Sequence, residues 1–180
     1  MVKREEQQRR RKQAAELMRE SGVVFQEREI ERIEVADFGL SDLATEGAQI
    51  FSLFDTKRLA ARVIVLFPYQ TEPEHWHQSV GKIEGKEETF RVISGKLLLY
   101  TEGEDTLKEG RIPEKSREYY TCRHEQVLYP GDTVTLEPGR KHWFQAAEVP
   151  TVFYSMSTTA VDACDPFTNP NIRRVTQVVD

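Results

Sequence analysis

Residues 75–95 read HWHQSVGKIEGKEETFRVISG, and residues 131–142 read GDTVTLEPGRKH. In both stretches, histidines flank short apolar runs that are bounded by Ser-Gly or Pro-Gly turns. Residues two apart in a β-strand point to the same face, so His75 and His77 can direct both imidazoles at one point. The glycines allow tight turns between strands, and the proline before the second one fixes φ at the turn entry. The spacing predicts that His142, just past this turn, points into the interior of the fold, toward His75 and His77.

Side chains with metal-binding chemistry are concentrated in these two stretches. Three of the four histidines of the chain lie there, and Glu88 lies between them. Three imidazoles and one carboxylate suit a borderline divalent cation such as Mn²⁺, Fe²⁺, Co²⁺, Ni²⁺ or Zn²⁺. The remaining histidine, His124, falls outside the pattern, and we assign it no role. The predicted metal ligands are His75, His77, Glu88 and His142.

The chain changes character at about residue 47, where short β-like runs begin. Turn residues such as Ser94-Gly95, Pro130-Gly131 and Pro138-Gly139 separate these runs. Many short strands without a long helix between them predict an antiparallel β-sandwich or barrel, so we expect an all-β fold. The expected strands are 49–55, 61–68, 88–94, 96–102, 125–130, 133–138, 142–147 and 151–157.

One domain with two extensions accounts for the 180 residues, a length that buries roughly 70% of the unfolded surface. The stretch 3–21 is rich in Arg, Glu, Gln and Ala, and predicts a helix that ends near Ser21-Gly22. Its few apolar residues predict packing on the outside of the domain or against a partner subunit. A second short helix is expected at about 28–34. The predicted parts are a helical extension, a β-barrel and an extended tail, at 1–46, 47–160 and 161–180.

The composition argues against several kinds of partner. The 25 basic and 30 acidic residues give a net charge of −5, which disfavours general nucleic-acid binding. The basic run 9–12 has glutamates around it and is expected to be a solvated helix face. No apolar run approaches the roughly 20 residues of a membrane helix, and the start has no apolar signal core. Cys122 and Cys164 show no CxxC spacing, so we expect no disulfide framework, no thiolate zinc site and a cytoplasmic location.

The two stretches match the paired sequence motifs of the cupin superfamily. The first motif has HWH, then Glu88, then Gly95, and the second has Gly131, then Pro-Gly, then His142. The resemblance implies a cupin-type antiparallel barrel, or jelly roll. The ten residues before Glu88, 78–87, form a longer gap than the general pattern has. This Gly- and Lys-rich insertion is expected to form a loop over the barrel mouth.

Within the cupins, the chain resembles the D-lyxose isomerase family. The motifs that carry this resemblance span nearly the whole chain, and they are LFPYQTEPEHWH, EGKEETFRVISGKLLLYTEGE, YYTCRHE, KHWFQA and FTNPNI. The resemblance implies an aldose–ketose isomerase that interconverts D-lyxose and D-xylulose, with D-mannose and D-fructose as a second pair. It also implies a free-sugar substrate, Mn²⁺ as the preferred metal, a homodimer, and metal ligands at the four residues named above.

The predicted ligand set suits this reaction. A cation near the carbonyl and hydroxyl oxygens of a sugar acts as a Lewis acid and stabilises the developing enediolate. The reaction then needs a proton shuttle or a metal-assisted hydride shift, and both routes stay open. Lys86 is our first candidate for an acid, a base or an oxyanion partner, because on an extended strand it shares a face with Glu88 and Phe90. The alternative for Lys86 is a lysine on a solvent-exposed loop.

Two aromatic residues, Phe90 and Phe144, are predicted to line a sugar pocket, and the barrel core is the alternative for each. Strand alternation places Phe144 on the same face as His142 and turns Trp143 away. Arg173 and Arg174 can reach a carboxylate, but a surface tail is the default expectation for both.

One position departs from the family pattern. Relatives tend to carry a glutamate in the last strand, where this chain has Ser155. Another acid can take its place, and the candidates are Glu148, Asp162 and Asp165. The departure also keeps a non-catalytic sugar-binding cupin open as an alternative, and an Fe-dependent oxygenase is a further one. A phosphosugar isomerase is disfavoured because the sequence has no glycine-rich phosphate loop.

Overall fold

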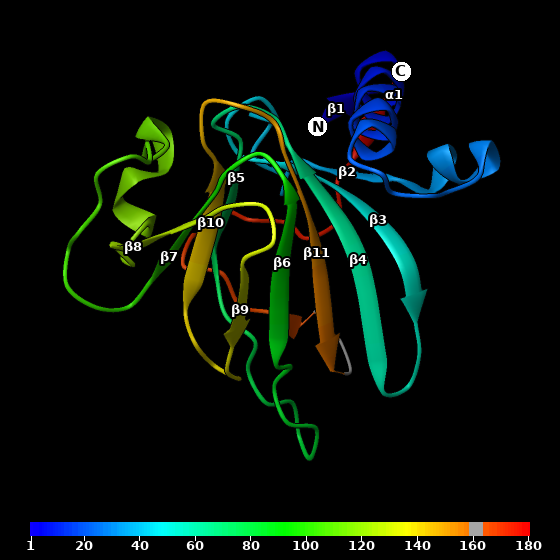
Figure 1. Ribbon diagram of the computed structural model, residues 1–180. Coiled ribbons are helices and arrows are strands. Elements are labelled where there is room, and N and C mark those ends of the chain that lie inside the picture. Colours follow the sequence, from blue (N-terminus) through cyan, green and yellow to red (C-terminus); the bar gives the residue numbers. More distant parts are fainter. Residues whose placement is uncertain (159–163) are drawn as a thin grey trace.

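Two antiparallel β-sheets form the body of the molecule (Figure 1). The computed structural model describes residues 1–158 and 164–180. The sheets confirm the expected all-β, cupin-type fold. The larger sheet has the order β2 (Glu34–Ala36), β3 (Ala48–Asp55), β4 (Leu59–Leu66), β11 (Thr151–Thr158), β6 (Glu88–Ser94) and β9 (Thr133–Leu136). The smaller sheet has the order β5 (Thr71–His75), β10 (His142–Ala146), β7 (Leu97–Thr101) and β8 (His124–Leu128).

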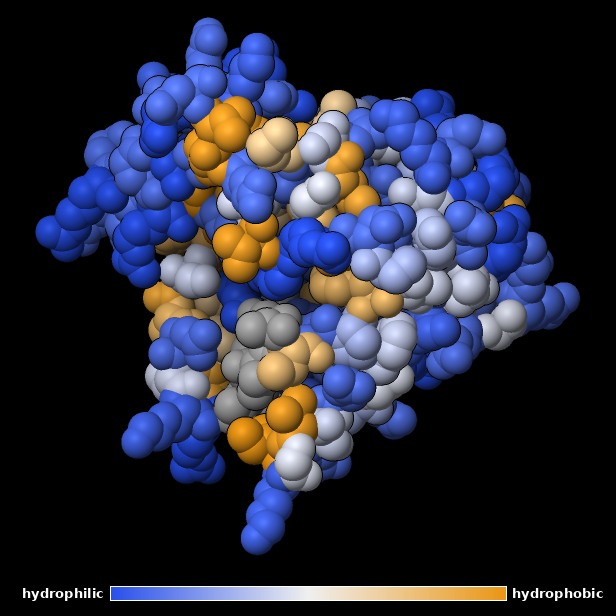
Figure 2. Space-filling model, turned by 180° about the vertical axis from the view of Figure 1, so that it is seen from behind, coloured by the Kyte–Doolittle hydropathy of each residue, from blue (hydrophilic) through white to orange (hydrophobic). Residues whose placement is uncertain are grey.

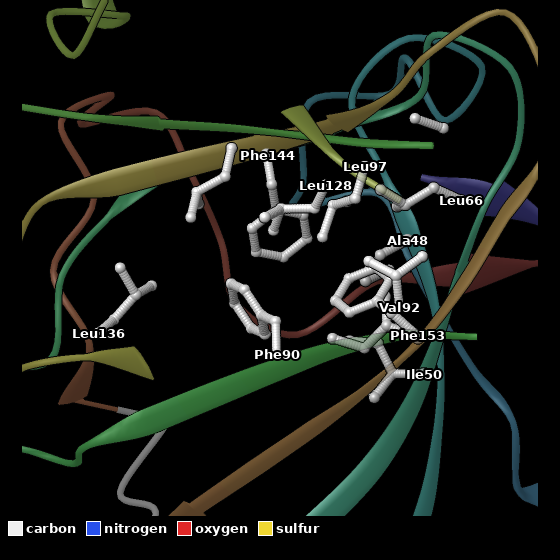
Figure 3. Packing of buried hydrophobic residues seen from close by; sticks show 14 of the residues in the cluster. Ala48, Ile50, Leu66, Phe90, Val92, Leu97, Leu128, Leu136, Phe144 and Phe153 are labelled. Atoms are coloured by element: carbon white, nitrogen blue, oxygen red, sulfur yellow. The ribbon is translucent and has the colours of Figure 1, made fainter. Parts of the chain in front are cut away.

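Alternation along the strands decides which side chains fill the space between the sheets. On β4, Ile64 belongs to the core cluster between the sheets, whereas Val63 belongs to a second cluster on the outer face. Three phenylalanines, Phe90, Phe144 and Phe153, lie near the middle of the inner core (Figure 3). Their ring centroids are 5.1 to 5.4 Å apart in edge-to-face arrangements. Each such pair stabilises the fold by roughly 0.5–1.5 kcal/mol beyond its burial.

A long helix, α1 (Arg4–Glu20), covers part of the outer face of the larger sheet. Its buried residues Ala14, Ala15 and Met18 pack in the same cluster as Phe51 of β3 and Val63 of β4. The helix ends where Gly22 adopts a φ of 81°, a left-handed conformation that favours glycine. Of the two expected positions for this helix, the structure shows packing against its own barrel.

The chain termini add strands that the sequence analysis did not predict. Val2–Lys3 (β1) pairs in parallel with Val178–Val179 (β12), so the two ends lie together beside α1 (Figure 1). The predicted helical extension also contains β2, which joins the larger sheet, and its second helix is a short 3₁₀ helix, Glu27–Arg32 (η1). Two-residue strands have no detectable sequence period, which explains why they were missed.

Each of the eight predicted strands overlaps an observed one, with ends that differ by up to about two residues. A further 3₁₀ helix, Glu114–Tyr119 (η2), lies between β7 and β8. The insertion 78–87 projects beyond the end of the barrel where β5 ends and β6 begins (Figure 1). Hydrophilic residues cover most of the rear surface, and apolar side chains appear there in separate patches (Figure 2). In the described part of the chain, no helix has both the length and the apolar character needed to cross a bilayer.

Candidate metal centre

The sheet pairing brings the four predicted ligands together at one end of the barrel. His75 is the last residue of β5 and pairs directly with His142, the first residue of β10. Glu88 opens β6, and His77 lies just beyond the end of β5. One possible ligand atom from each of the four residues lies within 4.8 Å of the others, and all four side chains are buried. The predicted set is therefore assembled in space.

Each imidazole has its Nδ1 atom held by a partner outside the cluster. Nδ1 of His75 lies 2.8 Å from the carbonyl oxygen of Pro73, and Nδ1 of His142 lies 2.8 Å from that of Arg140. A carbonyl oxygen only accepts hydrogen bonds, so Nδ1 carries the proton in both rings and Nε2 carries the lone pair. Nδ1 of His77 lies 2.9 Å from Oδ2 of Asp165. All three rings can therefore present Nε2 as a metal ligand.

The electrostatics of the cluster match a metal donor set. Burial, together with the neighbouring histidines, lowers the pKa of His75 well below its usual value and that of His142 to about 4, so both rings are neutral at pH 7. Burial alone would raise the pKa of Glu88, but Lys86 and His77 outweigh it and hold that pKa well below its usual range. Burial likewise opposes the charge on His77, yet hydrogen bonding to Asp165 and Glu88 raises its pKa.

These observations test whether the residues suit a metal. Nε2 of His142 is buried and has no hydrogen-bond partner within the described residues, although it lies 3.9 Å from the Glu88 carboxylate. A buried nitrogen lone pair without a donor is costly unless a ligand uses it. Two neutral imidazoles, a third that can give up its proton and an ionised carboxylate make a suitable set for a divalent cation. The cluster can hold a metal ion.

Two further side chains contact the carboxylate of Glu88. Oγ of Ser155 donates a hydrogen bond to Oε1 over 2.5 Å, and Nζ of Lys86 lies 3.4 Å from the same oxygen. Lys86 is only 7% exposed, so the solvent-exposed alternative for this lysine is wrong. Its cation holds Glu88 ionised and lies beside the four candidate ligands.

A cavity opens beside the cluster and encloses about 420 Å³, including its mouth. The space inside it that a water-sized sphere can occupy is about 30 Å³, so the cavity is small. Phe144 lines the cavity, whereas Phe90 packs beneath it with its ring centroid 6.3 Å from that of His142. The residues that line the cavity are Ile50, Arg62, Ile64, Glu72, His75, Lys86, Glu88, Phe144, Ser155, Asp165, Phe167 and Arg174.

Several of these residues were missed or misplaced by the sequence analysis. Arg62 and Glu72 were not singled out, although Arg62 shares the inward alternation of Ile64 and was detectable in that way. Arg174 was expected on a surface tail, but it lines the cavity, and its Nη1 lies 2.8 Å from Oε1 of Glu34. No local pattern marks that position.

The three candidate acids have different outcomes. Asp165 lies at the cluster, in contact with His77. Glu148 is wrong as a site residue, because it follows the opposite end of β10 and forms an exposed ion pair with Lys96. Asp162 lies outside the described residues. Trp143 points away from the cavity, as predicted, and stacks on Tyr100 at 3.7 Å between ring centroids.

The fold and the site together define a cupin with a candidate metal centre at the barrel mouth, and its structural neighbours are sugar isomerases. Over 99% of this chain, it superposes on L-ribose isomerase from Cellulomonas parahominis, covering 98% of that chain with a TM-score of 0.84 at 16% identity. L-ribose isomerase from Geodermatophilus obscurus gives a TM-score of 0.71 at 16% identity, over 97% of this chain and 90% of that one. At such low identity, these likenesses establish the fold alone.

Sequence relatives identify the family. The chain is 43% identical to a D-lyxose ketol-isomerase from Cohnella laeviribosi over 166 residues, which are 92% of this chain and 91% of the relative. It is also 43% identical to a D-lyxose/D-mannose isomerase from Thermosediminibacter oceani, over 92% of both chains. No family model matches the chain. The chain belongs to the D-lyxose isomerase family and is an isomerase, which confirms the resemblance and favours an enzyme over the binding-protein and oxygenase alternatives.

Proposed function

We propose that this protein is a metal-dependent isomerase that interconverts D-lyxose and D-xylulose, with D-mannose and D-fructose as a second pair. The observation that carries the proposal is the buried group of three imidazoles and one carboxylate at the wall of a small polar cavity. The names of the relatives support the choice of sugars, because they act on D-lyxose or on D-lyxose and D-mannose.

The residues that would hold the metal are His75, His77, Glu88 and His142. When bound, a divalent cation supplies Lewis-acid stabilisation of the negative charge that develops on the sugar oxygens during isomerisation. We expect Mn²⁺, while Co²⁺, Ni²⁺, Fe²⁺ and Zn²⁺ also suit this donor set. The charge of Lys86 helps to keep Glu88 ionised, and the hydrogen bond from Ser155 fixes its orientation before any ligand enters.

The remaining side chains of the cavity bind and orient the sugar. Lys86 reaches the cavity as a cation, so it can donate a proton or a hydrogen bond to the oxygen on C1 or C2 that becomes negative during the reaction. Phe144 offers an apolar wall against the C–H face of the sugar. Arg62, Glu72 and Arg174 bring polar groups to the same cavity, which suits a substrate with several hydroxyl groups.

An isomerase assay with a matched pair of histidine variants tests this proposal. Protein stripped with a chelator and refilled with Mn²⁺ is offered D-lyxose and D-mannose, and the ketose formed is measured. We expect ketose only after refilling, loss of turnover in His142→Ala, and normal turnover in His124→Ala, because His124 is exposed on β8. Full metal occupancy without ketose from either sugar would favour a sugar-binding cupin, and Fe²⁺-dependent oxygen consumption would favour an oxygenase.

We further propose a homodimer in the cytoplasm, with the outer face of the larger sheet at the interface. Four apolar side chains there are 38% to 55% exposed, and they are Leu53, Phe54, Leu59 and Met156 of β3, β4 and β11. The helix α1 is the weaker choice, because its buried apolar residues already pack on the barrel. Light scattering after gel filtration should give twice the mass of the chain, and Phe54→Glu should shift that value toward the monomer.

A further inference from the structure

We propose that Asp165 is a positioning residue for the metal centre, and that it links metal binding to the docking of the C-terminal segment 164–168. This inference rests on the proposed metal site. Oδ2 of Asp165 lies 2.9 Å from Nδ1 of His77, and the carboxylate is only 12% exposed. It therefore holds the ring of a predicted ligand from the side opposite to the cluster.

His77 differs from the other two histidines in the origin of its partner. His75 and His142 each use the carbonyl of a residue two positions earlier, so their orientation is set locally. The partner of His77 comes from the other end of the chain and carries a negative charge. A carboxylate behind a histidine ligand fixes the ring and makes its free nitrogen a stronger donor. The strength of this ligand therefore depends on where the C-terminal segment lies.

The segment is anchored just after Asp165. The carbonyl oxygen of Pro166 accepts a hydrogen bond from the backbone N–H of Trp76 over 3.2 Å. Thr168 donates its backbone N–H to the carbonyl oxygen of Glu74 over 3.0 Å and its hydroxyl to the carboxylate of Glu74 over 2.6 Å. All of these contacts run along β5 and its continuation. Since β5 is an edge strand of the smaller sheet, the segment covers an otherwise open edge.

Phe167, two residues after Asp165, contacts a second candidate ligand. It forms a bridge with His75, and its ring centroid lies 5.4 Å from that imidazole. Both Asp165 and Phe167 line the cavity beside the metal ligands. The C-terminal segment therefore lines the site and also holds one candidate ligand in place. A change in the position of this segment should alter the affinity for the metal.

Metal affinity separates this proposal from a purely structural role. Mn²⁺ and Co²⁺ affinities are measured by chelator competition for the wild type, Asp165→Ala, Asp165→Asn and the control Asp105→Ala, whose carboxylate forms an exposed ion pair with Arg123. We expect Asp165→Ala to lose about 10- to 100-fold in affinity, as outer-shell partners typically do. Asp165→Asn should lie between it and the wild type, since its amide oxygen can still lie against Nδ1 of His77 but carries no charge. The control should match the wild type.

The melting temperature of the metal-free proteins and the visible spectrum of the Co²⁺ forms complete the experiment. We expect a changed Co²⁺ spectrum in Asp165→Ala even where the metal-free melting temperature is unchanged. Wild-type affinity in both Asp165 variants would overturn the proposal, and a wild type that binds neither metal would overturn it together with the metal site. A wild type that binds Mn²⁺ but forms no ketose would refute the proposed function alone, because the affinity comparison still stands.

Discussion

Phe144 and Phe153 offer a controlled test of which core ring also serves the cavity. Both rings are at most 1% exposed, and each packs edge to face against Phe90 and against the other. Replacement of either one by alanine should cost about 3–5 kcal/mol, from the lost burial and the cavity left behind. For a chain of this size, that cost lowers the melting temperature by about 6–20 °C. The two variants should therefore be destabilised alike.

Their effects on substrate binding should differ. Phe144 lines the cavity and lies 6.4 Å from the ring of His75, whereas Phe153 belongs to the core and is absent from the cavity wall. We expect Phe144→Ala to raise KM for D-lyxose roughly 3- to 10-fold, equivalent to about 0.7–1.4 kcal/mol, while Phe153→Ala leaves KM near the wild-type value. KM is measured at 25 °C with saturating Mn²⁺, and thermal melting is followed by circular dichroism. If the alanine variants fail to fold, the leucine pair is used. An equal KM in both variants would refute the assignment of Phe144 to the substrate pocket.

Three further predictions concern two catalytic candidates and the two cysteine thiols. Lys86→Ala should lower kcat more than about tenfold, as loss of an acid–base group typically does. The control Lys82→Ala, on the exposed loop, should keep a normal kcat. A normal kcat in Lys86→Ala would exclude Lys86 from the mechanism. Glu72→Gln should also lower kcat at least about tenfold with Mn²⁺ affinity retained, because Glu72 is a carboxylate that lines the cavity and is not one of the four candidate ligands. An unchanged kcat would exclude it as a proton carrier. Burial and the nearby Glu74 raise the pKa of Cys122 to about 12, so its thiol stays protonated at pH 8. Cys122 should therefore react with Ellman's reagent only after unfolding, whereas the exposed Cys164 should react at once. Two fast thiols at pH 8 would contradict this.

The ligand set could be predicted because its signals are local. The two-residue spacing of His75 and His77 and the Pro-Gly turn before His142 are properties of short segments. The strands that position them also show apolar alternation between turn residues. The structure differs only in detail, since His77 lies beyond the end of β5 and its orientation depends on Asp165.

The rest of the site depends on contacts between distant segments. Asp165 and Arg174 reach the cavity because the C-terminal segment folds along β5 and returns to the N-terminus, where β12 pairs with β1. No periodicity marks such a path in a polar tail. Arg62 is the exception, because it lies in an apolar run and its inward orientation follows from Ile64 two residues later.

The measurement that tests the central claim most directly is ketose formation from D-lyxose as a function of bound metal. Metal-free protein is titrated with Mn²⁺, the bound metal per chain is determined by mass spectrometry, and D-xylulose is quantified at each point. One site formed by His75, His77, Glu88 and His142 predicts activity that rises linearly and stops at one metal ion per chain. Equal turnover by metal-free protein, or activity that does not follow the bound metal, would contradict the account.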